Sequence, residues 1–296
     1  MSHLVQELKD MKPEKEFFIG FDSDGCVFDS MEIKQKECFC PAFVNHFDMQ
    51  GAATAAREVW EFVNLYSKTR GCNRFLAIIR AIELLSERRE VIERGLQVPT
   101  VAGLVEWTRR ESKLGQATLE PEVEKNPHPD LVRALGWSRD VTDAVKKIVR
   151  NLPPYPQVRG ILDEAYKKAD LMVVSQTPTG DLEREWAEHG IDGHVRIIAG
   201  QERGTKAEHL KYAAVGKYDA DKILMIGDAP GDLKAAQDNG VLFFPIIPGT
   251  EEESWVKFRD EGLDRFFSGT FAGDYQERLL AAFDAALPEN PPWSSI

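Results

Sequence analysis

Cysteine is scarce in this chain of 296 residues, which contains only Cys26, Cys38, Cys40 and Cys72. The spacing of Cys38, Cys40 and Cys72 fits no common zinc-binding pattern. Reduced thiols, buried or incidental, are the ordinary state of cysteine in a cytosolic protein. We therefore expect reduced cysteines and no zinc site.

Long hydrophobic runs are absent as well. No uninterrupted apolar stretch approaches the length that spans a membrane. Residues 1–16 are charged and polar, with no apolar run after a basic start, so a secretory signal is not expected. These absences predict a cytoplasmic protein that has no membrane partner.

Positive charge is in deficit. The chain has 37 Lys and Arg residues against 49 Asp and Glu residues, a formal net charge of −12 and a pI of about 5.1. An acidic chain without a basic block is a poor candidate for nucleic-acid binding, so we expect no nucleic-acid partner. An anionic substrate would need a few local cations or a metal ion.

Hydrophobic residues make up 43% of the chain, enough for a sizeable core. Phe17–Phe21 is typical of a short buried strand. From Pro153 onward, apolar strands alternate with helical stretches, a pattern that predicts a parallel sheet with helices on both faces. The predicted strands of this region are Leu171–Val174, Val195–Ile198, Ile223–Ile226 and Leu242–Phe244. The fold class is therefore α/β, and we expect Phe17–Phe21 to join this sheet.

The residues between about 32 and 152 contain no convincing strand and show helical spacing instead. Ser138 or Asp140 could begin the last helix of this block, and residues 116–129, with three prolines, look like a loop inside it. We predict an α/β domain over 1–31 and 153–296, with an all-helical domain over 32–152 inserted into it.

Polar side chains follow the predicted strands. Each signal is weak by itself, since such residues are often helix caps or turn residues. In parallel sheets, however, ligands bind beyond the carboxyl ends of the strands, so these side chains would meet at one edge. The residues are Asp22 and Asp24 after the first strand, Ser175 and Gln176 after "LMVV", Lys206 at a helix start, and Asp228 and Asp232 in "GDAPGD".

These motifs resemble those of the haloacid dehalogenase superfamily of phosphohydrolases and phosphotransferases. "FDSDGCVFDS" matches the family's first motif, a hydrophobic strand followed by Asp-x-Asp-x-(Thr or Val), with Cys26 as a departure in the last position. "VVSQTP" matches the second motif through Ser175, Lys206 matches the third, and "MIGDAPGD" matches the fourth through Asp228 and Asp232. The resemblance covers Phe17–Ser30 and about 153–248. It implies a Rossmann-like core in which the helical insertion is a C1 cap.

The resemblance also implies a Mg²⁺ cofactor and roles for the acids. The metal ligands would be the Asp22 side chain, the Asp24 backbone carbonyl and the Asp228 carboxylate, with Asp232 ligating or orienting them. Asp22 would attack phosphorus to give an aspartyl phosphate. Asp24 would protonate the leaving oxygen and later deprotonate the attacking water.

Other residues are expected to hold the substrate. Lys206 and the Ser175 hydroxyl would bind the phosphoryl oxygens, together with backbone N–H groups around Gly25. Gln176 is a further candidate for substrate binding.

The helical insertion contributes a second candidate region. "NLYSKTRGCNRF" places Lys68, Arg70 and Arg74 around Gly71, between two helical segments. These cations could meet a second anionic group or the hydroxyls of a sugar. The alternative is a solvated turn between helices.

We predict a Mg²⁺-dependent phosphatase that acts on a small phosphorylated metabolite, such as a sugar phosphate, as a monomer or homodimer. Asp24 favours phosphate ester chemistry, since a dehalogenase needs only the nucleophile. A phosphomutase of β-phosphoglucomutase type uses the same core residues and remains an alternative. The alternative from another class is a catalytically inactive regulator that binds a ligand.

Overall fold

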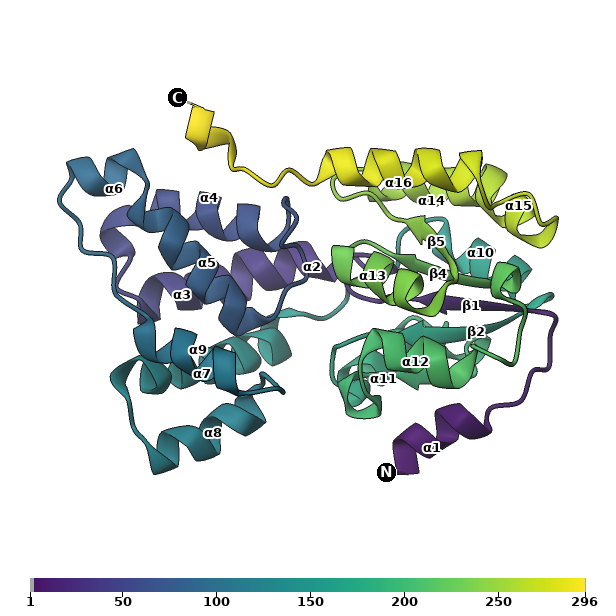
Figure 1. Cartoon of the computed structure of the whole chain (residues 1–296), viewed down its shortest axis with the longest axis horizontal. Helices are drawn as coiled ribbons and strands as arrows, with labels where there is room; N and C mark the ends of the chain where they lie inside the picture. Colours follow the sequence, from purple (N-terminus) through teal and green to yellow (C-terminus); the bar gives the residue numbers. More distant parts are fainter. Residues whose placement is uncertain (1–2, 296) are drawn as a thin grey trace. The chain divides into compact units, whose positions relative to one another are not determined.

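The computed structural model describes residues 3–295, and the chain forms two compact units (Figure 1). The α/β unit comprises residues 1–31 and 151–288, and the helical unit comprises 32–150 and 289–296. These ranges differ from the predicted domains by two residues at the second linker. They also differ at the C-terminal segment, which groups with the helical unit because Trp293 packs against Phe62 and Arg88 of that unit.

A five-stranded parallel sheet forms the centre of the α/β unit. Its strands are β1 (Phe17–Phe21), β2 (Ala169–Val174), β3 (Ile197–Ala199), β4 (Ile223–Gly227) and β5 (Leu242–Pro245), in the order β3-β2-β1-β4-β5. Ile19 of β1 pairs with Leu171 of β2 and with Leu224 of β4. The predicted α/β class and the position of the first strand within this sheet are confirmed.

Side chains of successive strand residues point to opposite faces of the sheet, and each face packs against helices. Phe17, Ile19 and Phe21 belong to one hydrophobic cluster, whereas Phe18 belongs to another. The first cluster includes residues of α10 (Val158–Ala165), α11 (Thr179–Glu188), α14 (Glu251–Lys257) and α15 (Leu263–Phe267). The second includes residues of α1 (His3–Asp10), α12 (Lys206–Ala213) and α13 (Pro230–Asn239), and α16 (Asp274–Ala286) contributes to both. The sheet is therefore the middle of three layers.

Short 3₁₀ and π-helical segments connect these elements. The 3₁₀ turns of the α/β unit are η3 (Asp192–His194), η4 (Gln201–Arg203) and η5 (Ala220–Lys222). The π-helical segment η6 (Phe258–Gly262) joins α14 to α15, so the chain stays helical from Glu251 to Phe267.

The helical unit is built around aromatic side chains. The ring centroids of Phe43 and Trp60 lie 4.8 Å apart, those of Trp60 and Trp137 5.8 Å, and those of Phe75 and Trp107 5.2 Å. Its α-helices are α2 (Ser30–Ile33, which begins in the α/β unit), α3 (Cys40–His46), α4 (Ala53–Asn64), α5 (Arg74–Ser86), α6 (Arg89–Glu93), α7 (Ala102–Arg110), α8 (Gln116–Lys125) and α9 (Pro129–Ile148). It also has the π-helical segment η1 (Lys34–Phe39) and the 3₁₀ turns η2 (Gln50–Ala52) and η7 (Pro292–Ser295). Large aromatic rings supply much of the apolar area that such a unit buries.

Two expectations for this unit are wrong. Residues 116–125 form helix α8, with Pro121 inside it, rather than a loop. Leu119 is fully buried, so packing outweighs the backbone hydrogen bond that Pro121 cannot donate. Helix α9 begins at Pro129 after the N-cap His128, so Ser138 and Asp140 lie in its interior instead of at its start.

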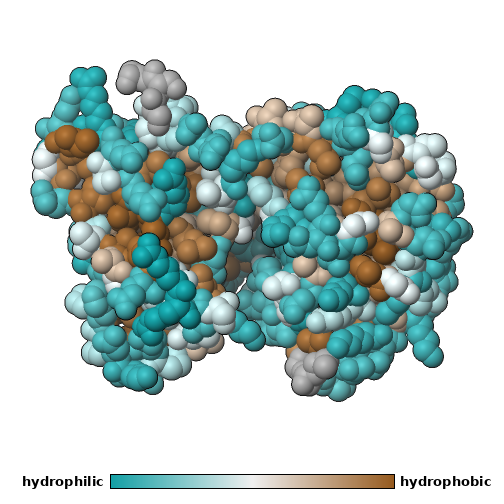
Figure 2. Space-filling model, viewed as in Figure 1, coloured by the Kyte–Doolittle hydropathy of each residue, from teal (hydrophilic) through white to brown (hydrophobic). Residues whose placement is uncertain are grey.

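Exposed apolar side chains are scattered. On the face shown in Figure 2, hydrophobic residues reach the surface over more of the helical unit than of the α/β unit. The large exposed ones belong to both units: Leu76, Ile92, Val132, Ile148, Tyr166, Val215 and Val256. No helix within residues 3–295 has the length and hydrophobicity needed to cross a bilayer.

One buried carboxylate attaches the N-terminal segment to the sheet. Asp170 of β2 accepts hydrogen bonds from the Glu14 amide (2.8 Å), the Lys15 amide (3.0 Å), the Tyr218 hydroxyl (2.6 Å) and Arg196 Nη1 (2.9 Å). Burial alone would raise the pKa of Asp170, but these hydrogen bonds outweigh it and hold the pKa below its ordinary value.

Asp170→Asn should lower the free energy of unfolding by about 2–4 kcal/mol at pH 7, because it weakens four bonds and leaves Arg196 without its buried anion. The pKa of Asp170 is lower in the folded than in the unfolded state, where it is about 3.9. Its stabilisation is therefore present above that value and is lost as the pH falls through the folded-state pKa. Urea titrations at pH 7 and pH 3 measure both effects.

The exposed Asp221→Asn is the matched control and should change stability little at either pH. Equal losses in the two variants would show that Asp170 does not hold the N-terminal segment.

Candidate functional site

The polar residues predicted to follow the strands lie at one edge of the sheet. Asp22 follows β1, Ser175 follows β2, and Asp228 follows β4. These three strands are neighbours in the order β2-β1-β4. Parallel pairing brings their carboxyl ends together, so residues far apart in the sequence become neighbours.

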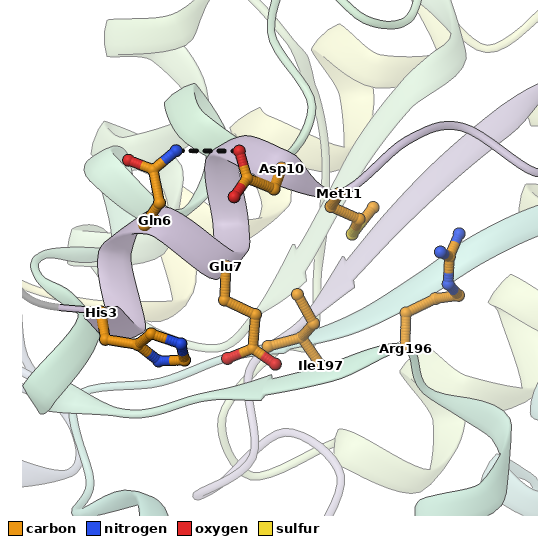
Figure 3. Close-up of a pocket in the computed structure, with 7 residues that line it drawn as sticks. All are labelled: His3, Gln6, Glu7, Asp10, Met11, Arg196 and Ile197. Atoms are coloured by element: carbon orange, nitrogen blue, oxygen red, sulfur yellow. Dashed lines mark hydrogen bonds between the residues drawn. The ribbon is translucent and has the colours of Figure 1, made fainter.

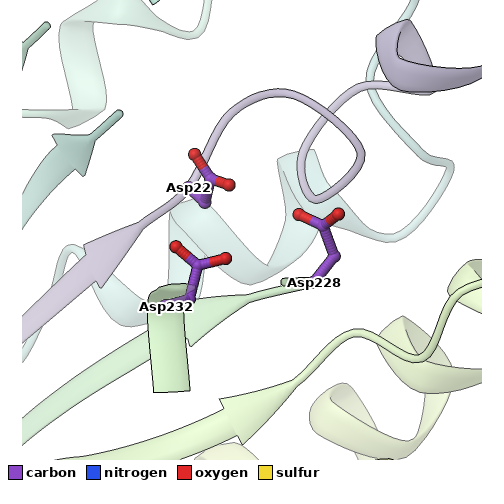
Figure 4. Close-up of side chains that lie close together, drawn as sticks. All are labelled: Asp22, Asp228 and Asp232. Atoms are coloured by element: carbon purple, nitrogen blue, oxygen red, sulfur yellow. The ribbon is translucent and has the colours of Figure 1, made fainter. Parts of the chain in front are cut away.

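Three carboxylates converge at this edge (Figure 4). One oxygen from each of Asp22, Asp228 and Asp232 lies within 4.8 Å of the others, and all three residues are buried. Burial, followed by the charge of Asp232, raises the pKa of Asp22 well above its ordinary value. A buried group of oxygen ligands is the donor set that hard divalent cations prefer, so these residues fit such an ion.

Lys206 is the cation closest to this cluster among the described residues. Its Nζ lies 2.8 Å from Asp22 Oδ2 and 2.5 Å from Asp232 Oδ1. Burial alone would lower the pKa of Lys206, but the charges of Asp22 and Asp232 outweigh it and raise the pKa above its ordinary value. Lys206 therefore stays protonated and offsets part of the negative charge.

Lys206 and Asp232 each lie in the first turn of a helix, where hydrogen bonds at the helix start fix their positions. The Thr205 hydroxyl accepts a hydrogen bond from the Glu208 amide (3.2 Å), and Glu208 accepts one from the Thr205 amide (2.8 Å), which fixes Lys206 as the first residue of α12. Asp232 Oδ2 accepts a hydrogen bond from the Ala229 amide at 3.0 Å. Its other oxygen is then directed to Lys206.

Gly227 leaves the space that Asp232 occupies. A Cβ atom at position 227 would lie 2.4 Å from Asp232 Cγ and 2.6 Å from Asp232 Oδ2, closer than real contacts permit. Gly227 ends β4 and leaves room for the Asp232 side chain. Asp228, the next residue, directly follows the strand.

The loop after β1 is held by its own backbone. The Asp22 amide donates to the Ile226 carbonyl (2.9 Å), and Asp22 Oδ1 accepts from the Ser23 amide (2.8 Å). Gly25 has a φ of +78°, which few other residues adopt, and its N–H donates to the Phe28 carbonyl at 2.8 Å. The N–H expected to bind a phosphoryl oxygen is therefore used within the loop.

Two hydroxyls hold the Asp24 carboxylate. Thr177 Oγ1 donates to Asp24 Oδ2 at 2.6 Å, and Ser30 Oγ donates to Asp24 Oδ1. The sequence reasoning missed both residues. The sequence pointed to them only through their positions near the motifs. Thr177 is two residues after Ser175, and Ser30 is the last residue of "FDSDGCVFDS".

Ser175 and Gln176 connect neighbouring loops. Ser175 is buried, its amide donates to the Ala199 carbonyl (2.9 Å), and its Oγ accepts from the Thr177 amide (3.2 Å). Accepting that bond does not use the Ser175 hydroxyl proton. Gln176 is exposed and donates from Nε2 to the Gly204 carbonyl at 2.9 Å. Substrate binding by Gln176 stays a prediction.

Cys26 lies beside the site but is not poised for reaction. Burial first, and the charge of Asp228 next, raise the pKa of its thiol well above the ordinary value. The thiol sulfur lies 3.7 Å from the Ile226 carbonyl oxygen. A buried neutral thiol fills this position as a small apolar side chain would.

The cations predicted in the helical insertion are mostly used inside the helical unit. Arg70 is buried, and its Nη1 donates to the Leu65 carbonyl at 2.9 Å. The Arg74 guanidinium lies over the ring of Phe39, 5.2 Å from its centroid, and burial lowers its pKa. Lys68 is exposed. Arg70 and Arg74 therefore stabilise the turn. Their contact with a substrate stays a prediction, and these existing contacts argue against it.

A hollow of about 510 Å³ lies elsewhere in the α/β unit, between α1 and the region around β3 (Figure 3). It is lined by His3, Gln6, Glu7, Asp10, Met11, Arg196 and Ile197. Glu7 already pairs with Arg203 at 2.7 Å, and Gln6 with Asp10 at 2.8 Å. None of the residues predicted for the site belongs to this hollow.

The comparisons with known proteins agree with the motifs. Residues 116–246 match the family described as haloacid dehalogenase-like hydrolase, a range that contains Ser175, Lys206, Asp228 and Asp232. This match covers part of the chain and supports the resemblance that the motifs indicate. No curated protein matches the sequence.

Several solved structures are similar to this chain. A haloacid dehalogenase-like family hydrolase from Streptococcus pneumoniae is 14% identical, covers 81% of this chain and 90% of its own, and has a TM-score of 0.42. A candidate phosphoglycolate phosphatase from Lactobacillus delbrueckii is 17% identical, with coverage of 77% and 85% and a TM-score of 0.45. Another hydrolase from S. pneumoniae is 15% identical, with coverage of 84% and 99% and a TM-score of 0.44. These likenesses carry no argument about the site, which rests on its motifs and geometry.

Gly227→Ala should lower the free energy of unfolding by about 1–3 kcal/mol, because the new methyl group forces Asp232 or the start of α13 to move. Urea denaturation measures the change. Gly231→Ala is the matched control, since no atom lies within 4 Å of the added Cβ, and it should be close to neutral. Equal stability of the two variants would mean that Asp232 moves aside freely.

Proposed function

We propose that this protein is a Mg²⁺-dependent phosphatase that acts on a small phosphorylated metabolite through an aspartyl-phosphate intermediate. The observation that carries the proposal is a buried cluster beyond the ends of β1 and β4. Asp22, Asp228 and Asp232 converge in it, and Lys206 contacts Asp22 and Asp232. Such a cluster of like charges is costly to bury unless a function uses it.

Mg²⁺ fits the donor set of this cluster. Asp22 and Asp228 would hold it through carboxylate oxygens, the Asp24 backbone carbonyl would add a ligand, and Asp232 would ligate or orient. The bound ion would offset the charge of the acids and polarise a phosphoryl oxygen.

The residues around the cluster suit an in-line transfer. A carboxylate oxygen of Asp22 would attack phosphorus while the ester P–O bond breaks, and Asp24 would give its proton to the leaving oxygen. Water would then attack the phosphorus of the aspartyl phosphate, with Asp24 taking a proton, to release inorganic phosphate and restore Asp22. The hydroxyls of Thr177 and Ser30 would hold Asp24 between these two tasks.

Lys206 and Ser175 would bind the phosphoryl oxygens. Lys206 Nζ already lies 2.8 Å from Asp22, so a phosphoryl group next to that carboxylate would come within its reach. The Ser175 hydroxyl proton would supply a second donor. Fixed donors of this kind stabilise the charge that develops on the transferred group.

The sugar-phosphate substrate, the monomer or homodimer state and the cytoplasmic location stay predictions. A phosphomutase would use the same core residues, and product analysis separates the two activities. Release of inorganic phosphate supports a phosphatase, whereas an isomeric phosphate ester supports a mutase.

Asp22→Asn should lower kcat by roughly 10⁴-fold or more, because it removes the nucleophile. Hydrolysis of para-nitrophenyl phosphate and an unfolding curve measure activity and folding on the same sample. Asp29→Asn, an exposed acid in the same segment, is the control and should keep its rate. A near-normal rate in a folded Asp22→Asn protein would contradict the mechanism.

Removal of divalent cations with EDTA should abolish hydrolysis, and added Mg²⁺ should restore it. A second readout does not depend on activity: Mg²⁺ should raise the Tm of the wild-type protein, since a ligand that binds only the folded state stabilises it. The shift should be much smaller in Asp228→Asn. Full activity in EDTA, or equal Tm shifts in both proteins, would argue against a metal at this cluster.

A further inference from the structure

The C-terminal segment returns to the helical unit after the last helix of the α/β unit. Leu287 is fully buried in the hydrophobic cluster that includes α1, α12 and α13, whereas residues 289–296 group with the helical unit. The chain therefore crosses between the units at Pro288 and Glu289. This crossing is a third covalent connection, in addition to those at 31/32 and 150/151.

Trp293 is the anchor of this segment. The Arg88 guanidinium lies 4.5 Å from the centroid of its indole ring, within the range of a cation–π interaction. The Phe62 ring meets the indole edge-on at 5.4 Å. Both partners belong to the helical unit, with Phe62 in α4 and Arg88 as the N-cap of α6.

The Arg88 side chain is buried, although it carries a charge. It is 6% exposed, and its Nη2 pairs with Glu58 at 2.6 Å and with Glu90. Its Nε and Nη1 atoms are buried without a hydrogen-bond partner among the described residues. The guanidinium contacts the face of the Trp293 indole ring instead of further hydrogen-bond acceptors.

The spacer between core and anchor is stiff. "LPENPPW" places Pro288, Pro291 and Pro292 between Leu287 and Trp293. Prolines restrict the free chain, so less entropy is lost when the segment is held at both ends. A short spacer also keeps the anchor at a high effective concentration near its binding site.

We propose that residues 288–293 form a strap that restrains the movement of the helical unit relative to the α/β unit. Two linkers alone leave two compact units free to move as a hinge. The strap adds a third attachment through a single half-buried aromatic side chain. An anchor of that size releases and rebinds, so it limits the range of motion without locking the units. The inference does not rest on the proposed phosphatase activity.

The test measures the distribution of distances between the units in the full chain. Two exposed lysines are replaced by cysteine to carry spin labels, Lys125→Cys in the helical unit and Lys234→Cys in the α/β unit. Cys72→Ser removes the half-buried thiol that could also react with the label. Double electron–electron resonance then gives the width of the distribution. We expect Trp293→Ala, and truncation after Pro288, to broaden it by roughly 2-fold, since loss of the anchor leaves only the hinge.

Matched variants separate the strap from other effects. Trp293→Phe keeps an aromatic anchor, and truncation after Trp293 keeps the whole strap, so both should resemble the intact chain. Equal widths in all variants would overturn the proposal.

Removing Trp293 could also loosen the helical unit itself. Hydrogen exchange of the α4 and α5 amides in the same variants decides this point. The strap requires a broader distribution with exchange rates in α4 and α5 within about 3-fold of the intact chain. Broadening that is accompanied by lost protection in α4 and α5 would assign Trp293 to the folding of the helical unit and overturn the strap.

Discussion

The site depends on keeping three mutually repelling carboxylates together in a buried part of the α/β unit. Asp22, Asp228 and Asp232 are buried, and one ammonium group, Lys206, touches two of them. Such an arrangement is unfavourable unless the backbone fixes each group, because isolated buried charges are costly. The parallel order of the strands, the glycine before Asp228 and the capping contacts of α12 and α13 are the parts of the fold that meet this requirement.

The cations that the sequence singled out have different kinds of partner. In the α/β unit Lys206 belongs to the acid cluster, whereas in the helical unit Arg70 and Arg74 bond to a carbonyl, a serine hydroxyl and an aromatic ring. A guanidinium can bond to several neutral groups at once, which makes arginine suitable for holding turns and helix junctions. The presence of a cation in a loop between helices therefore says little about ligand binding until its partners are known.

The sequence predicted structure best where the pattern is local, as in the strands and the residues that directly follow them. The apolar run Phe17–Phe21 and the alternation of apolar strands with helical stretches after Pro153 predicted the five strands within a few residues. The positions that follow these strands predicted the acids of the cluster. Sequence reasoning failed where a contact joins distant segments. The bonds of Thr177 and Ser30 to Asp24, the burial of Arg70, and the helix that tolerates Pro121 all follow from tertiary packing that local patterns do not encode.

The position of β1 in the sheet has a consequence for the order in which the protein is made. Phe17 of β1 pairs with Ala169 of β2, and Phe18 pairs with Ile223 of β4, so the central strand is synthesised long before either neighbour. Contacts between such distant residues form slowly, because a long loop must close first. On the ribosome, a strand of five buried residues would emerge and wait while the whole helical insertion is translated. Until β2 emerges, β1 has no strand partner, so its apolar side chains are open to aggregation for that time.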